Sequence, residues 1–443
     1  MNKNSKWQIT LLVSVFLAAL CIGSAFSTGA QEEPVKEAME AKEVTLRIFA
    51  RAYTWDQEAP WEVAKAEIQK RHPETKFTFV EEGFGWADLR AKFLIAAAGG
   101  NPPDVAQVDI IWVGEYVEGG LLTDLTDKLN AWSEWPDVVD SFKESTKWKG
   151  PSYGTWLNTD VRVMGYNKKL FRKAGLDPNS PPEDWNQLYD MAKKITSAPA
   201  YYGYGFPAMK EEETSMRFFT MLYSAGGQIL TDDLKKAAFN SAAGVKALAF
   251  NAKMVEDGLT PKSIVSGNYM DIDNAVFQDK FAMSYMTKTL GLAKKLIPDL
   301  TPEQFKQDFG AAPIPKAPGG EWSTMSGGYL LSVPKGTKHP DLAWELISIG
   351  AAPDAQFKYT SARGYVPTFY SLMERPEDYF SVDPYFNVIL NSLPYAHFRP
   401  GLPQYTEISA AIQDAIQAAV LGQLSPKAAL DAAAVKVNQL LAQ

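Results

Sequence analysis

Apolar residues in the first part of the chain alternate between the spacing of strands and the spacing of helices. Three segments have the apolar and β-branched content of strands: residues 44–50, 76–82 and 103–111. Two segments between them have the period of a helix: residues 61–71 and 86–98. Gly99 follows the second helix as a stop signal. Strands and helices in this order predict an α/β layer around a sheet.

The same alternation continues in the rest of the chain. Four further segments have a helical apolar face: residues 166–175, 181–196, 408–422 and 425–441. In the second of them, Trp185, Leu188, Ala192 and Ile195 share one face. The chain shows no internal repeat, and about 400 ordered residues are enough for two α/β domains.

The N-terminus has the organisation of a secretory signal. Two lysines precede the apolar run 9–22, which is too short to span a membrane, and small residues follow it. We therefore expect a signal peptide over residues 1–30, with cleavage after Ser27 or after Ala30. Residues 31–42 are charged and nearly free of large apolar groups, so they are predicted to be a flexible tether.

Cys21 is the only cysteine of the chain and lies inside the predicted signal. The mature protein is therefore expected to contain no disulfide. A lipid anchor on Cys21 is the alternative, but Leu20 stands where that pattern requires a small residue. Either route predicts an exported protein, periplasmic or held at the cell surface.

The charge and the scarcity of histidine exclude several classes of function. The formal net charge is −8, and no long run of Lys or Arg is present, so nucleic acid is not an expected partner. His72, His339 and His397 are too far apart in sequence to give a metal-ligand motif. No cofactor motif is found either, and the prediction is a protein without metal or cofactor.

Motifs for catalysis are missing from the sequence. It has no nucleophile elbow, no phosphate-binding glycine loop and no His-Glu-x-x-His motif, and no catalytic residue is assigned. Paired carboxylates for glycoside hydrolysis remain an alternative, because acids distant in sequence meet in folded proteins. The candidates for such a pair are Glu81, Glu82, Asp109 and Asp160. We favour carboxylates that are solvated or that bind a ligand.

Several aromatic side chains fall in predicted loops instead of helix faces. They are Tyr53, Trp55, Trp86, Trp112, Trp156 and Trp322. In α/β sheets, the loops after the strands form the ligand crevice. A sugar has apolar C–H faces and a belt of hydroxyls, which suit aromatic rings combined with Asp, Asn and Arg. These loops therefore predict a carbohydrate site.

The segment "YGTWLNTDVRVMGYNKKLF", residues 153–171, combines such polar groups with a strand. Trp156, Asn158 and Asp160 precede the apolar residues that begin at Val161. Burial of an amide or a carboxylate is costly unless the group finds a partner. We interpret these three side chains as facing a cleft, with the ligand as their partner.

Five stretches of the chain, in order, resemble one known family. They are "AAGGNPPDVAQVDIIWVGEYVEGGLLTDLTD", "TDVRVMGYNKKLFRKAGLDP" with "PPEDWNQLYDMAKKIT", "FQDKFAMSYMTK", "MSGGYLLSVPKGTKHPDLAWELI" and "LGQLSPKAALDAAAVKVNQLL". The family is that of the extracellular sugar-binding proteins of ABC importers, which includes maltose-binding protein. In the third stretch Asp279 stands where the family usually has Gly.

The resemblance implies a two-lobed α/β fold of the periplasmic-binding-protein type, type II-like, with a ligand cleft between lobes joined by hinge crossovers. Lobe 1 would comprise residues 43–157 and 333–373. Lobe 2 would comprise residues 163–325 and 385–443. The hinge crossings would be residues 158–162, 326–332 and 374–384. Closure about such hinges is a known property of periplasmic binding proteins.

The resemblance also implies which positions meet the ligand. Five positions match family motifs or lie in the crossover: Asp109, Trp112, Asp160, Gly327 and Gly328. Other ligand-facing positions, where residue identity varies in the family, are Tyr53, Trp55, Trp86, Trp156, Asn158, Lys288, Trp322 and Arg363. Arg162 is expected to pair with a nearby carboxylate and to stiffen the hinge.

The function implied by the resemblance is capture of a mono- or oligosaccharide by cleft closure and delivery to the permease of an ABC importer. The expected partners are the carbohydrate and the permease subunits, and the protein is expected to be a monomer and not an enzyme. Two alternatives remain open: a non-sugar solute such as a polyol or a glycerol phosphate ester, and an exported glycoside hydrolase. A phosphate ligand would require basic residues in the loops, and few are present.

Overall fold

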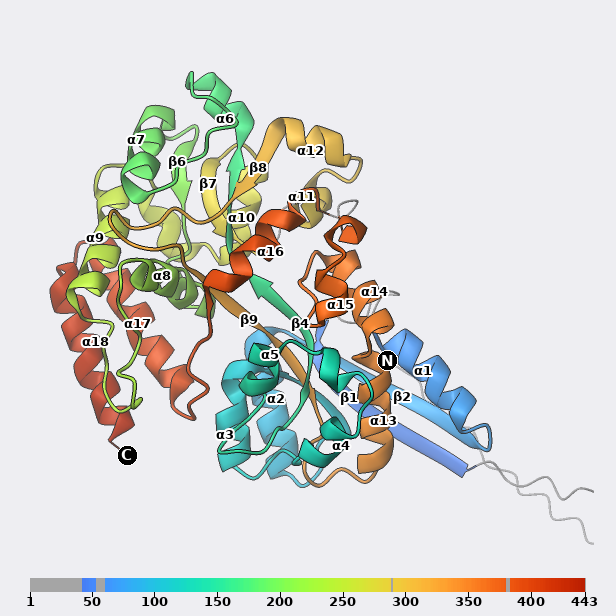
Figure 1. Cartoon of the computed structure of the whole chain (residues 1–443). Helices are drawn as coiled ribbons and strands as arrows, with labels where there is room; N and C mark the ends of the chain where they lie inside the picture. The colour runs from blue at the N-terminus through green and yellow to red at the C-terminus, as the bar shows by residue number, and fades with distance from the viewer. Residues whose placement is uncertain (1–41, 53–59, 288–289, 380–382, 443) are drawn as a thin grey trace, which may run out of the picture. The chain divides into compact units, whose positions relative to one another are not determined.

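The computed structural model describes residues 42–52, 60–287, 290–379 and 383–442 (Figure 1). Its strands form two separate sheets, one of six strands and one of four, and helices pack on both. The predicted α/β class is therefore confirmed. The predicted signal peptide and all but the last residue of the predicted tether lie outside the described residues. That last residue, Lys42, is the first residue of strand β1.

The first sheet is completed by strands from distant parts of the sequence. Its strands are β1 (Lys42–Arg51), β2 (Thr75–Phe84), β3 (Val105–Asp109), β4 (Thr155–Val161), β9 (Thr324–Ser332) and β10 (Ala396–His397). The order is β10-β9-β3-β1-β2, and β4 also pairs with β9. β1 is parallel to β2 and β3, whereas β9 is antiparallel to β3 and β4. β9 therefore has three partner strands.

Helices from the first and the later part of the chain accompany this sheet. They are α1 (Pro60–Arg71), α2 (Trp86–Ala98), η2 (Ile110–Trp112), α3 (Val113–Glu118), α4 (Thr126–Asn130), η3 (Trp135–Asp137), α5 (Asp140–Ser145), α13 (Pro340–Gly350), α14 (Pro353–Arg363) and α15 (Tyr370–Met373). Leu46, Trp61 and Leu346 belong to one buried cluster that joins β1 to α1 and α13. β3 is buried at all five positions, as expected for a strand covered on both faces.

The second sheet has the order β6-β7-β5-β8. Its strands are β5 (Val163–Asn167), β6 (Tyr202–Gly205), β7 (Phe281–Met286) and β8 (Phe309–Ala312). The helices of this part are α6 (Lys168–Lys173), α7 (Trp185–Ile195), α8 (Glu212–Ser224), α9 (Ala242–Glu256), η4 (Lys262–Ser266), α10 (Tyr269–Phe277), α11 (Leu290–Leu296), α12 (Pro302–Asp308), η5 (Pro376–Tyr379), α16 (Phe386–Ser392), η6 (Leu393–Tyr395), α17 (Tyr405–Val420) and α18 (Pro426–Leu441). Among the described residues, no helix combines the length and the apolar content that crossing a membrane requires.

Two predicted helices show how local sequence sets the element boundaries. The predicted face of α7 is confirmed, since all four of its stripe residues are buried, and the side chain of Asp184 caps the helix by accepting from the Gln187 N–H at 2.9 Å. The helix predicted over residues 166–175 begins later, at Lys168. Tyr166 is a buried residue of β5, and Asn167, the last residue of that strand, caps α6 by accepting from the Leu170 N–H.

The chain passes from the first sheet to the second at Arg162, the single residue between β4 and β5. It returns between the end of β8 at Ala312 and the start of β9 at Thr324. The proposed lobe and hinge boundaries stay a prediction, and the short β4–β5 junction lies inside the first of the expected crossings. The side chains of this junction form the site described next.

Candidate functional site

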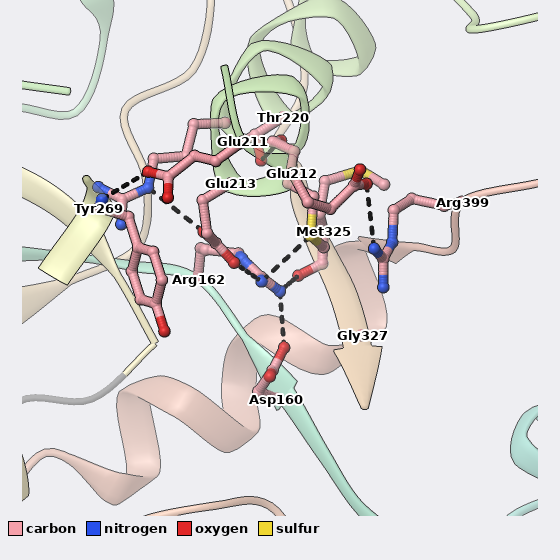
Figure 2. A network of polar contacts seen from close by, with 12 residues as sticks. Asp160, Arg162, Glu211, Glu212, Glu213, Thr220, Tyr269, Met325, Gly327 and Arg399 are labelled. Atoms are coloured by element: carbon pink, nitrogen blue, oxygen red, sulfur yellow. Dashed lines mark hydrogen bonds and ion pairs between the residues drawn. The ribbon is translucent and has the colours of Figure 1, made fainter. Parts of the chain in front are cut away.

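A buried ion network lies where the strands of the first sheet meet helix α8 (Figure 2). We define it as three arginines and five carboxylates: Arg162, Arg217, Arg399, Asp109, Asp160, Glu212, Glu213 and Asp273. Each of these side chains is 15 % exposed or less. The excess of carboxylates over arginines gives the network a negative balance. Charges buried to this degree require pairing, because their desolvation is costly.

Arg162 connects the β4–β5 junction to α8. Its Nη1 donates to Asp160 Oδ1 at 2.6 Å and to the Met325 carbonyl at 3.2 Å, and its Nη2 pairs with Glu213 (Figure 2). Burial alone would lower the pKa of Arg162, but the carboxylates of Asp160 and Glu213 raise it. The expected pairing of Arg162 with a nearby carboxylate is therefore present. The guanidinium fixes the strand junction to the first turn of a helix.

Three consecutive glutamates at the start of α8 have different environments. Burial would raise the pKa of Glu213, but Arg162 and Arg217 lower it to about 2. Burial raises the pKa of Glu212 although Arg399, Tyr405 and Ser409 oppose this shift. Burial likewise raises the pKa of Glu211, to about 7. Helix N-termini favour negative charge, so this turn suits glutamates, and the arginines decide which of them stays ionised.

Asp109 ends β3 and is fixed by donors from three directions. Its carboxylate accepts from Trp86 Nε1 at 2.9 Å, from Arg399 Nη2 at 3.1 Å and from the Ile111 N–H at 3.3 Å. The Trp86 ring, which is half-buried, lies beside the fully buried Trp112 with centroids 5.2 Å apart. A carboxylate, a guanidinium and an indole with exposed surface therefore meet at this strand end.

Arg399 bridges the two halves of the fold. It pairs with Asp109 at the end of β3 and, through Nη1 at 3.0 Å, with Glu212 of α8. Its Nε has no hydrogen-bond partner within the part of the chain that the structure describes. The first turn of α8 also accepts hydroxyl donors from α17, since Tyr405 and Ser409 both bond Glu212.

Gly327 and Gly328 of β9 lie close to these groups, and at Gly328 the backbone leaves no room for a side chain. A Cβ on Gly327 would lie 3.2 Å from Arg399 Nη2 and 3.4 Å from Asp160 Oδ1. A Cβ on Gly328 would lie 2.3 Å from the Asn158 carbonyl oxygen, and its φ of +139° is disfavoured for other residues. The predicted glycine pair is therefore brought together with Asp109 and Asp160 by the fold.

Comparison with known proteins shows the family to which the chain belongs. The sequence profile of the family described as bacterial extracellular solute-binding protein matches residues 53–357. The chain belongs to this family. A binding protein of Brucella abortus is 26% identical over 439 residues, which is 98% of both chains.

Two further relatives have described ligands. The crystal structure of an ABC transporter solute-binding protein from Thermotoga lettingae bound with α-D-tagatose is 29% identical, with a TM-score of 0.79 over 90% of this chain and 100% of that one. The arabinooligosaccharide-binding protein of Bacillus subtilis is 24% identical over 398 residues, 84% of this chain and 87% of that protein. The two-lobed fold and the role of solute-binding component of an ABC transporter are thereby confirmed, and the family implies an exported location.

The structure encloses three of the predicted ligand contacts of this solute-binding protein. Trp112, Trp156 and Asn158 are all 1% exposed or less. The Trp156 Nε1 donates to the Phe142 carbonyl at 2.8 Å, and its ring packs on Phe142 and Phe398. Neither amide atom of the Asn158 side chain has a partner within the described residues. Their ligand contact stays a prediction, which requires a conformation that uncovers them.

The remaining predicted contacts lie away from the network or outside the described residues. Trp322 is half-buried, with Lys316 Nζ 5.6 Å from its ring centroid, and among the described residues no hydrogen bond joins it to the ion network. Tyr53, Trp55 and Lys288 lie outside the described residues, and of Arg363 only its backbone at the end of α14 is described. Within the described part of the chain, no group of acidic, His or Cys side chains has the arrangement of a metal site.

Five residues of the network were missed by the sequence reasoning: Arg217, Arg399, Glu212, Glu213 and Asp273. Arg399 lies 290 residues from Asp109, so no local pattern connects them. Arg399 lies between Phe398 and Pro400, in a loop that follows several short apolar segments. That position was the only indication in the sequence that Arg399 could belong to a site. The run of three glutamates at a helix start was a second signal for partners with positive charge.

Proposed function

We propose that this solute-binding protein captures a carbohydrate at the site formed by Trp86, Asp109, Asp160 and Arg399. The observation that carries the proposal is the Trp86–Asp109 pair. A half-buried indole is fixed by its own N–H to a buried carboxylate, and that carboxylate also accepts from a guanidinium. An apolar ring face beside oriented polar groups suits the two kinds of surface of a sugar.

The relatives support the same class of ligand. The Thermotoga lettingae protein holds a monosaccharide, and the Bacillus subtilis relative is named for an arabino-oligosaccharide. In this chain, hydroxyl groups of the sugar would donate to Asp109 and Asp160 and accept from Arg399. The sugar stabilises the closed arrangement of the lobes because only that arrangement contacts it from both sides. The loaded protein then delivers the ligand to the permease as a monomer and without catalysis.

The charge balance of the site favours a neutral ligand over a phosphate ester. All three arginines of the network already pair with carboxylates, and the carboxylates outnumber them. An anionic ligand would have to displace these acids at a further cost in repulsion. A neutral sugar adds hydrogen bonds without that cost. The same balance makes a glycerol phosphate ester the less favoured alternative.

A thermal-shift screen of the mature protein against neutral sugars, polyols and glycerophosphodiesters tests the ligand class. A ligand at a hundredfold excess over its Kd stabilises the protein by about 2.7 kcal/mol. Stabilisation by sugars but not by the diesters is expected, and the opposite result would overturn the proposal. A turnover assay on the oligosaccharides that bind should detect no products, whereas hydrolysis would establish an enzyme.

Two variants test the position of the site. Trp86→Ala and Asp109→Asn should each weaken sugar binding by tenfold or more, about 1.4 kcal/mol, since each removes a stacking surface or a charged acceptor. Asp341→Asn is the matched control, because its side chain is 89% exposed and lies on α13. Unchanged sugar affinity in both site variants, measured by titration calorimetry, would place the ligand elsewhere.

A further inference from the structure

One carboxylate of the proposed site, Asp109, is joined to helix α8 through Arg399. Arg399 donates to Asp109 at 3.1 Å through Nη2 and pairs with Glu212 at 3.0 Å through Nη1. Glu212 is fixed in turn, because its carboxylate accepts from the hydroxyls of Tyr405 at 2.6 Å and Ser409 at 2.7 Å. Within the described residues Arg399 Nε has no hydrogen-bond partner, so the two carboxylates orient this guanidinium. We call the contacts Asp109–Arg399–Glu212 the Arg399 bridge.

The second carboxylate of the site, Asp160, is joined to the same helix turn through Arg162 (Figure 2). Arg162 Nη1 donates to Asp160 at 2.6 Å, and Nη2 pairs with Glu213, the residue that follows Glu212 in α8. Arg217 Nε approaches the other carboxylate oxygen of Glu213 at 3.5 Å, so this glutamate is held from both sides. We call the contacts Asp160–Arg162–Glu213 the Arg162 bridge. Consecutive glutamates of one turn therefore reach the two site carboxylates, each through its own arginine.

The two bridges lie close together but share no ion pair among the described residues. Gly327 lies between them, since a Cβ on this residue would be 3.2 Å from Arg399 Nη2 and 3.4 Å from Asp160 Oδ1. Like charge keeps the two guanidiniums apart, so each arginine stays with its own pair of carboxylates. The bridges are therefore separate lines of contact from α8 to the site.

The Arg399 bridge decides how Asp109 can accept a ligand. A carboxylate has about four lone-pair sites for hydrogen bonds. Three donors already occupy such sites on Asp109: Trp86 Nε1, Arg399 Nη2 and the Ile111 N–H. The acceptor capacity that is left for a sugar hydroxyl depends in its direction on where these donors stand. Arg399 is the donor with the long, flexible side chain, so its position depends on the second anchor, Glu212.

We propose that Glu212 and Glu213 are positioning residues for the ligand. Through the Arg399 bridge and the Arg162 bridge they set the direction in which the site carboxylates accept hydroxyl groups of the sugar. The inference rests on the proposed function. The glutamates bind the arginines and not the sugar. A site whose contact groups are held in place by such supporting residues binds more tightly, because less order has to be imposed when the ligand enters.

Double-mutant cycles on sugar affinity test this inference. The measurement is titration calorimetry on the mature protein, with D-tagatose, arabinobiose and maltose as the probes. Glu212→Gln should weaken binding about fivefold or more in the wild-type background but less than about twofold in the Asp109→Asn background, because Glu212 acts through Asp109. Glu213→Gln should depend in the same way on Asp160→Asn. The crossed pairs, Glu212→Gln with Asp160→Asn and Glu213→Gln with Asp109→Asn, should be additive to within about twofold.

A milder variant and a matched control accompany the cycles, because loss of a buried charge can also destabilise the fold. Tyr405→Phe removes one donor to Glu212 and keeps the ion pair with Arg399. It should weaken binding about twofold to threefold, and this effect should disappear in the Asp109→Asn background. Thr220→Val is the control, since Thr220 is buried on α8 and its hydroxyl bonds the Met216 carbonyl outside the ion network. It should leave sugar affinity unchanged.

The outcomes separate this inference from the proposal of a carbohydrate site. The same loss from each glutamate substitution, whichever aspartate is replaced, would show general damage to the site and overturn the inference. Unchanged affinity in both glutamate variants and in Tyr405→Phe would also overturn it. Either result leaves the carbohydrate proposal intact as long as Asp109→Asn weakens binding. If the glutamate variants do not fold, the Tyr405→Phe cycle decides by the same criterion. A wild-type protein that binds none of the three sugars would overturn both proposals.

Discussion

Substitution of Arg399 by Met is the sharpest test of the buried ion network. The change keeps a long side chain but removes an arginine that pairs with both Asp109 and Glu212. Loss of one partner of a buried pair typically costs about 3–5 kcal/mol, because the other charge stays buried. Here both acids keep some donors, Trp86 for Asp109 and two hydroxyls for Glu212, so the lower end of that range applies.

The assay is urea unfolding at pH 5 and pH 8. In thermal unfolding, the same loss of about 3 kcal/mol in the free energy of unfolding corresponds to a Tm decrease of about 3–4 °C for a chain of this size. Burial already raises the pKa of Glu212, and without Arg399 it should rise further. A carboxyl whose pKa is raised by folding favours the folded state only below that pKa, so the loss should be larger at pH 8 than at pH 5.

The double variant Arg399→Met with Glu212→Gln supplies the control. Glutamine removes the unpaired charge and keeps an acceptor for Tyr405 and Ser409, so it should recover part of the stability at pH 8. Two results would refute the reasoning: a loss below about 1 kcal/mol at both pH values, or no recovery in the double variant. Either would mean that water reaches the two carboxylates and that the pairs contribute little.

Three more variants test other contacts, each by urea unfolding unless stated. Gly328→Ala should cost about 2 kcal/mol or more, because a Cβ there meets the Asn158 carbonyl at 2.3 Å and φ is +139°; an unchanged midpoint would contradict this. Glu211→Gln should stabilise the protein at pH 8 but not at pH 5, because burial raises the pKa of this carboxyl to about 7 and the folded state disfavours its ionised form above that value. Equal effects at both pH values would exclude a buried proton there. Trp156→Phe should cost about 1–2 kcal/mol through the lost hydrogen bond to Phe142, while calorimetry should detect weaker sugar binding only if the indole becomes exposed in the liganded protein.

Apolar periodicity in the sequence predicted those parts of the fold that depend on interactions between residues close in sequence. The apolar stripe of α7 lies on the buried face because its 3.6-residue period presents one side to the sheet. The glycine pair in β9 could be placed at the site because family motifs carry it. The Asp109–Arg399 pair could not be predicted from spacing, since the two residues meet only after the loop before α17 folds back beside β3.

The orientation of Trp156 shows a second limit. Along a regular strand, side chains alternate between the two faces, and we expected Trp156, Asn158 and Asp160 to share the cleft face. The register with β9 shifts between Trp156 and Asn158, where two residues oppose one step of the partner strand. Such a bulge re-aims side chains, and no residue type in the segment announces it. Trp156 lies packed against Phe142 as a result.

The position of β9 in the first sheet has a consequence for the order in which the protein becomes stable. β9 pairs with β3, β4 and β10, so the sheet that starts at Lys42 stays incomplete until residues 324–332 are available. Contacts between such distant segments form slowly, because a long loop has to close first. The N-terminal part should therefore remain unfolded during most of synthesis. Because its first sheet is completed late, the chain stays unfolded long enough to pass through a secretion channel.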